Sequence, residues 1–144
     1  MRYFASLISI FFLCLSVATV AGPLHEAVKA GKLEQVKTLL ESGTDINELD
    51  TDGESALSYA VRKKNKEMVE FLLSKKADIN LQNYVGDTPL MNAISVNAQE
   101  IVKLLLQHGA DTKLRNNIGA NAKDFAKSLK NKKILRLIRN SRRF

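Results

Sequence analysis

The sequence repeats itself every 33 residues. Alanine recurs at this spacing along most of the chain, at Ala27, Ala60, Ala93 and Ala126. Two apolar columns keep the same register: Val36, Val69, Val102 and Leu135, and Leu39, Leu72, Leu105 and Ile138. A fixed period of this length predicts a repeat architecture, in which one supersecondary unit is stacked on copies of itself. The register divides the chain into four units, at about 22–49, 50–82, 83–115 and 116–144.

The third unit indicates how each unit is built. Thr88 and Pro89 are typical of the N-cap and first turn of a helix, and Gly109 is typical of the residue that follows a helix. Asn97 between them suits a left-handed residue that separates two short helices. A helix pair this short cannot bury its own apolar face, so successive pairs must stack to form one continuous core.

These residues resemble an ankyrin repeat. In the third unit the likeness lies in GDTPL at 86–90, IVKLLL at 101–106 and GAD at 109–111. The second unit shares it at 52–57 and 69–73, and it extends from about Pro23 to the C-terminus. The resemblance implies an all-α solenoid of four stacked helix-turn-helix units. The last unit diverges, because Asn121-Ala122-Lys123 replaces the Thr-Pro-Leu signature.

The first 21 residues differ from the rest of the chain. Arg2 precedes an apolar run that ends in small residues at 18–22, which is the order of a signal peptide cleaved after Ala21. The alternative is an uncleaved membrane anchor, because the uncharged run from Tyr3 to Leu24 is just long enough to span a bilayer. We expect residues 22–144 to be exported, either into the periplasm of a Gram-negative bacterium or out of the cell. Removal of the segment also removes Cys14, the only cysteine.

No set of residues predicts catalysis, a metal site or a cofactor site. The sequence contains neither a nucleophile-elbow motif nor a phosphate-binding glycine loop. His25 falls at a family position that makes structural hydrogen bonds, and His108 falls at the end of a helix, where a cation is favourable. Asp45, Asp78 and Asp111 recur once per unit, which indicates turn hydrogen bonds.

The family resemblance implies binding of another protein through the hairpin tips and the concave face. Carried over position by position, the contact residues are Asp52, Glu54, Arg62, Lys63, Tyr84, Val85, Asp87, Asn117 and Ile118. The same positions include Ser95 and Val96 at the end of a first helix. Tyr84, Val85 and Ile118 either await a partner or pack against the neighbouring tip, since single exposed apolar residues are ordinary. An envelope enzyme or a toxin would suit such a partner, and we expect a monomer.

The basic C-terminus suggests an alternative function. No acidic residue follows Asp124, and Lys132, Arg136, Arg139 and Arg143 fall on one face of the expected last helix. This face could bind a polyanion, such as an anionic membrane surface. It could equally be the polar outer face of a terminal repeat. Nucleic acid is disfavoured as a partner, because no aromatic stacking platform is present.

Overall fold

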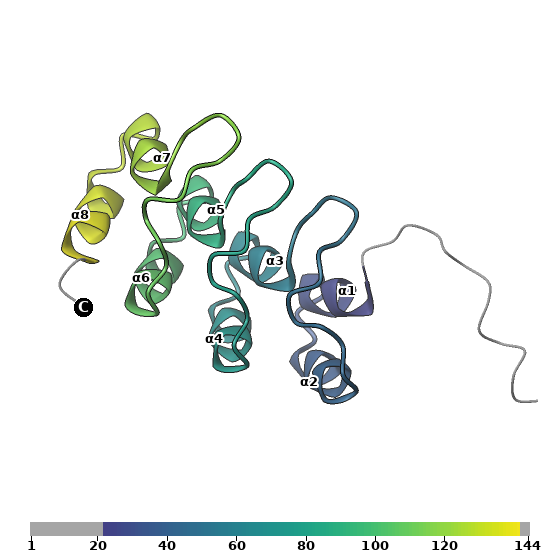
Figure 1. The fold of residues 1–144 in the computed structure, drawn as a ribbon. Helices are drawn as coiled ribbons and strands as arrows, with labels where there is room; N and C mark the ends of the chain where they lie inside the picture. Colours follow the sequence, from purple (N-terminus) through teal and green to yellow (C-terminus); the bar gives the residue numbers. More distant parts are fainter. Residues whose placement is uncertain (1–21, 142–144) are drawn as a thin grey trace, which may run out of the picture.

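The computed structural model describes residues 22–141, which form eight helices in four consecutive pairs (Figure 1). The first helices of the pairs are α1 Pro23–Lys29, α3 Ala56–Arg62, α5 Pro89–Ser95 and α7 Ala122–Ser128. The second helices are α2 Leu33–Glu41, α4 Lys66–Ser74, α6 Gln99–Gln107 and α8 Lys132–Asn140. The first helices line up in one row and the second helices in another, and the long loops between pairs project beyond the first row (Figure 1). The expected all-α stack of four helix pairs is confirmed.

The core runs continuously from pair to pair. Each first helix packs against the first helix of the next unit, and α6 packs against α4 and α8. Ala60, Ala93 and Ala126 are fully buried in this stack, and Ala27 is nearly so. Alanine at these positions lets the first helices approach closely, which explains why this column is the most strictly kept.

Polar side chains join the units along the loops. The backbone N–H of Asp78 donates to Asn47 Oδ1 at 2.8 Å, and that of Asp111 donates to Asn80 Oδ1 at 2.9 Å. Within each loop, the Asp side chain accepts a backbone hydrogen bond from the residue two positions on, as Asp45 does from Asn47. The expected turn role of the repeated aspartates is confirmed.

Four non-glycine residues end helices in the left-handed conformation. Asn97 has φ 53°, as its position between two helices predicts. Lys64, Lys76 and Lys130 have φ 55°, 64° and 51°, although left-handed backbone favours glycine. Gly31 has the same conformation one repeat before Lys64. The lysines therefore stand at positions where a glycine would be less strained.

The fourth unit keeps the fold despite its divergent sequence. Asn121 replaces Thr88 as the N-cap, and its side chain accepts hydrogen bonds from the backbone N–H groups of Lys123 and Asp124. Asp124 returns a bond by accepting from the Asn121 backbone N–H at 3.2 Å, which completes a capping box. The expected signal segment, residues 1–21, and Arg143 lie outside the described residues. None of the helices between residues 22 and 141 has the length and apolar character needed to cross a membrane.

Candidate partner-binding surface

The three hairpin tips, residues 50–54, 83–87 and 116–120, share one internal framework. In the second tip, Asn83 Oδ1 accepts from the backbone N–H groups of Val85 and Asp87 at 3.1 and 2.8 Å. Asn116 plays the same part in the third tip, and the carboxylate of Asp50 does so in the first. Each tip is therefore held in a fixed turn by a single side chain.

The same amides connect neighbouring tips. Asn83 Nδ2 donates to Glu54 Oε1 at 2.8 Å, and Asn116 Nδ2 donates to Asp87 Oδ1 at 2.7 Å. Glu54, one of the residues expected to contact a partner, is only 6% exposed. Its carboxylate also accepts from Arg62 at 3.2 Å, so it holds the first tip to the second and to α3. Asp87 is half-buried and has the equivalent structural role.

The second and third tips are joined further through Asn117. Its backbone N–H donates to the Val85 carbonyl at 3.0 Å, and its Nδ2 donates to the Tyr84 carbonyl at 2.9 Å. Asn117 remains exposed, so a partner can still reach it. The two tips form one hydrogen-bonded surface.

Three apolar side chains protrude from this surface. Tyr84 is 64% exposed, Val85 57% and Ile118 85%. Tyr84 also packs against the neighbouring tip: a Cβ built on Gly53 would lie 2.3 Å from Tyr84 Cγ. The packing against the neighbouring tip is therefore partial: one side of the Tyr84 ring covers Gly53, while most of its surface stays open. Val85 and Ile118 are open to solvent.

A hollow of about 540 Å³ lies between the first tip and the ends of α3 and α5. It brings together four of the expected contact residues, namely Asp52, Glu54, Arg62 and Lys63. Tyr59 and Val96 complete its lining. Acidic, basic and apolar groups meet here, so the hollow suits a mixed protein surface better than a ligand of one charge sign.

Leu129 belongs to the same row of positions and was missed from the sequence. It follows α7 as its C-cap residue and is 50% exposed. It lies one repeat period after Val96, which caps α5 and lines the hollow. The 33-residue register would have identified it, had the first-helix ends been carried over into the divergent fourth unit.

The two histidines have structural positions. His25 is fully buried, and its Nε2 is hydrogen-bonded to the Glu48 carbonyl at 3.0 Å. The exposed His108 is hydrogen-bonded through Nδ1 to the Leu104 carbonyl at 3.0 Å. Among residues 22–141, no three His, Cys, Asp or Glu side chains gather in a way that could hold a metal ion.

A polar cluster around Asp50 has perturbed acidities. Burial alone would raise the pKa of Asp50, but hydrogen bonds from the Tyr59 hydroxyl, at 2.6 Å, and from backbone N–H groups outweigh burial and lower it. Burial and the bond to Asp50 raise the pKa of Tyr59. Lys29 lies 4.2 Å from the centre of the Tyr59 ring; burial would lower its pKa, but Tyr59 and Glu26 together raise it. The cluster holds the first tip to the first two helix pairs.

The basic positions expected on the last helix are exposed. Lys132, Arg136 and Arg139 are exposed on α8, whereas Ile134 and Ile138 are buried. The fourth member of the expected row, Arg143, lies outside the described residues.

Comparison with known proteins agrees with this architecture. Residues 24–116 match the family model described as ankyrin repeats (3 copies). An ankyrin repeat protein of Fowlpox virus (strain NVSL) is 44% identical over 39 residues, which are 27% of this chain and 28% of the viral protein. The chain belongs to the ankyrin-repeat family. The match ends where the fourth unit begins, although the structure gives that unit the same helix pair.

Proposed function

We propose that this protein is an exported, non-catalytic module that binds another protein through its hairpin tips and the concave face beside them. Ankyrin repeats generally mediate protein–protein interaction. The observation that carries the proposal is the exposure of Tyr84, Val85 and Ile118 on tips that are themselves held rigidly. Tyrosine is enriched among the residues that contribute most to protein interfaces.

The rigidity of the tips supports tight binding. Association costs free energy when loops and side chains must be ordered at the interface. The bonds from Asn83, Asn116 and Asn117 order these tips before any partner arrives. The hollow beside Arg62 and Lys63 adds charged groups of both signs, which can fix the orientation of the partner. An envelope enzyme or a toxin would fit this role, with the protein itself acting as a monomer.

Replacing Tyr84 and Val85 with alanine tests the proposal. A photo-reactive amino acid at Ile118 would first identify a crosslinked partner in the source organism, and the interaction would then be measured with purified proteins. Tyr84→Ala with Val85→Ala should weaken binding by at least about tenfold, since hot-spot residues each contribute about 2 kcal/mol or more. Gln107→Ala with His108→Ala, at the exposed end of α6, should leave affinity unchanged. Equal binding by both double variants would overturn the surface assignment.

Export is proposed from the sequence of residues 1–21. The mass of the protein recovered from its source should correspond to a chain that begins at Gly22. An intact chain recovered in the membrane fraction would instead support the N-terminal anchor.

A second candidate function is polyanion binding by the outer face of α8. It is favoured by the exposure of Lys132, Arg136 and Arg139. Reversing the charge at Arg136, Arg139 and Arg143 should then abolish binding to heparin or anionic vesicles while capture of the tip partner persists. If binding to heparin and vesicles persisted, this face would not be the binding site and would serve only as the solvated outer side of the terminal repeat.

A further inference from the structure

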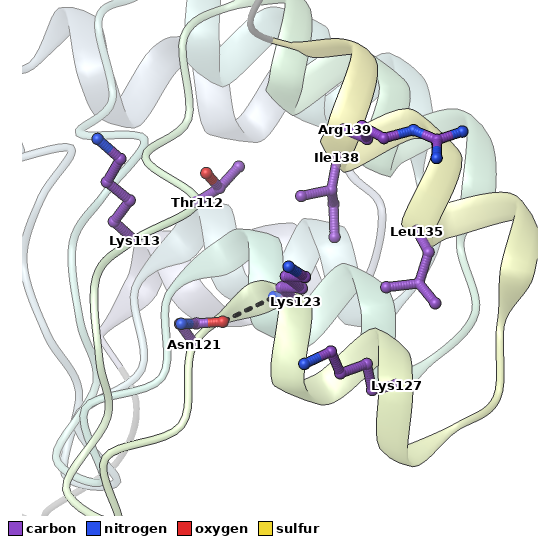
Figure 2. A pocket seen from close by; sticks show the side chains of 8 residues that line it. All are labelled: Thr112, Lys113, Asn121, Lys123, Lys127, Leu135, Ile138 and Arg139. Atoms are coloured by element: carbon purple, nitrogen blue, oxygen red, sulfur yellow. Dashed lines mark hydrogen bonds between the residues drawn. The ribbon is translucent and has the colours of Figure 1, made fainter.

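The last unit has an open side that the inner units do not have. Helices α7 and α8 pack on α5 and α6, and within residues 22–141 no helix covers their opposite side (Figure 1). A hollow of about 520 Å³ lies there, and Figure 2 shows Lys123 of α7 between the loop at Lys113 and Ile138 of α8. We call this surface the end face; its lining includes Lys113, Lys123, Lys127, Leu135, Ile138 and Arg139.

The repeat register shows what the end face corresponds to. Leu24, Leu57 and Leu90 are buried in the first three units, and Lys123 is the exposed equivalent in the fourth. Val28, Val61 and Ile94 are buried likewise, and Lys127 is their exposed equivalent. In the inner units, the first helix that carries these columns packs against the first helix of the following unit. The end face is therefore equivalent to an inter-unit interface, with no following unit within residues 22–141, and cations stand where the inner units have these apolar residues.

In two further repeat columns, a cation likewise stands at the end face where an earlier unit has an uncharged residue. Asn47 and Asn80 accept a hydrogen bond from the following unit, whereas Lys113 stands at the third position of that column. Leu106 is buried on α6, and Arg139 takes its place on α8. Leu135 is half-buried, although its equivalents Val36, Val69 and Val102 are fully buried. The end face thus combines cations with a partly open apolar floor.

The charged residues of this unit are almost all basic. Residues 116–141 contain seven lysines and arginines and a single acid, Asp124. Asp124 lies 3.9 Å from Lys127 and 3.9 Å from Arg115, so its charge is shared between two cations. Lys113 and Lys123 form no ion pair with any residue in the described part of the chain. By contrast, residues 22–49 at the other end contain five acids and three lysines. Solubility of a terminal unit needs polarity but not a single sign of charge.

We propose that the end face binds an acidic amphipathic helix of a partner protein. Carboxylates of the helix would pair with Lys113, Lys123 and Lys127, and its apolar side would cover Leu135. The shape argues for a helix, because helices of the next unit cover the equivalent face of every inner unit. Neither residues 1–21 nor residues 142–144 fit as this occupant, since neither segment contains an acid. This surface is separate from the hairpin tips and does not depend on them.

A synthetic peptide tests the proposal on the full chain. The probe is an amphipathic helix of about 20 residues, long enough to be helical alone, with glutamates on one face and leucines on the other. Its affinity is measured by fluorescence anisotropy for the wild type and for two double variants with the same change in charge. Lys123→Glu with Lys127→Glu alters the end face, and Lys132→Glu with Arg136→Glu alters the outer face of α8. Lys123→Gln with Lys127→Gln removes the charge without adding acids, in case charge reversal impairs folding.

The proposal expects a loss of affinity of about tenfold or more for both end-face variants and less than about threefold for the outer-face variant. A scrambled peptide of the same composition should bind at least about tenfold more weakly than the amphipathic one. Equal losses in the end-face and outer-face variants, or equal binding of the two peptides, would overturn it. Failure of the peptide to bind, with Lys123-dependent sedimentation on anionic vesicles or Lys123-dependent self-association, would overturn it in favour of a membrane surface or a second copy. Tip variants should bind the peptide normally, so this result is independent of the proposed function.

Discussion

The ring of Tyr84 lies across the backbone of Gly53, so that neighbouring hairpin tips touch where a side chain would not fit. Gly53 has φ 72° and is buried, and a Cβ there would approach three ring atoms at 2.3–2.7 Å. Tyr84, the most exposed aromatic residue of the proposed binding surface, can therefore take this position only because residue 53 in the preceding tip has no side chain.

Gly53→Ala tests this relationship. Alanine would have to adopt a left-handed conformation, which costs about 1–2 kcal/mol, and would also displace Tyr84. Gly119→Ala is the matched control, because Gly119 has φ 78° and no atom within 4 Å of a Cβ. We expect the free energy of unfolding in urea to fall by about 1 kcal/mol more for Gly53→Ala than for Gly119→Ala. Equal losses would show that Tyr84 moves aside without cost.

Ala93→Leu tests the stacking of the first helices. Ala93 is fully buried between neighbouring units, so extra volume should force them apart and lower the free energy of unfolding by about 1–3 kcal/mol. Ala30→Leu adds the same atoms at the exposed end of α1 and should change stability by less than about 0.5 kcal/mol. Thermal and urea unfolding would both report the difference.

Lys76→Gly should stabilise the protein. Lys76 is exposed and has φ 64°, a conformation that glycine adopts at no steric cost, so a gain of about 0.5–1 kcal/mol is expected after the entropy of the unfolded chain is counted. The adjacent Lys75 has φ −88°, and Lys75→Gly should be neutral or destabilising. A loss of stability in Lys76→Gly would mean that its side chain makes contacts worth more than the strain.

Asp50→Asn should reduce the sensitivity of the fold to acid. The pKa of Asp50 in the folded protein lies below its ordinary value of 3.8, so its carboxylate stabilises the fold above that value. This contribution is lost as the pH falls from about 3.8 through the lowered pKa. Asn83 and Asn116 accept the equivalent backbone hydrogen bonds in the other two tips, so the variant should fold. Urea unfolding at pH 7 and pH 3 should show a smaller loss of stability in the variant than in the wild type.

The fold could be predicted from the sequence because the residues that determine it recur every 33 positions. The column of Ala27, Ala60 and Ala93 reflects the close approach of first helices, and Asn97 reflects the left-handed turn between two helices. Repetition makes such positions stand out in the sequence. The role of Glu54 was not readable in the same way. A glutamate at a loop tip suggests exposure, and only the structure shows that the amide of Asn83, 29 residues later, takes its carboxylate.

The end face was missed for a related reason. Arg136, Arg139 and their neighbours were interpreted through helix periodicity, which groups residues on one helix, and Lys123 was interpreted only as a departure from the repeat signature. The structure instead gathers Lys113 from a loop, Lys123 and Lys127 from α7, and Arg139 from α8. Comparison down the repeat columns, with Leu90 becoming Lys123, contains the signal that helix periodicity lacks.

The amide–carboxylate bonds between tips have a direction along the chain. Each asparagine donates to the acid of the preceding tip, from Asn83 to Glu54 and from Asn116 to Asp87. The first tip carries Asp50 where the donor would stand, and the last carries Ala120 where the acceptor would stand. Asp50 and Ala120 thus end the series of amide–carboxylate bonds at the first and the third tip, so the bonds link only these three tips in one direction.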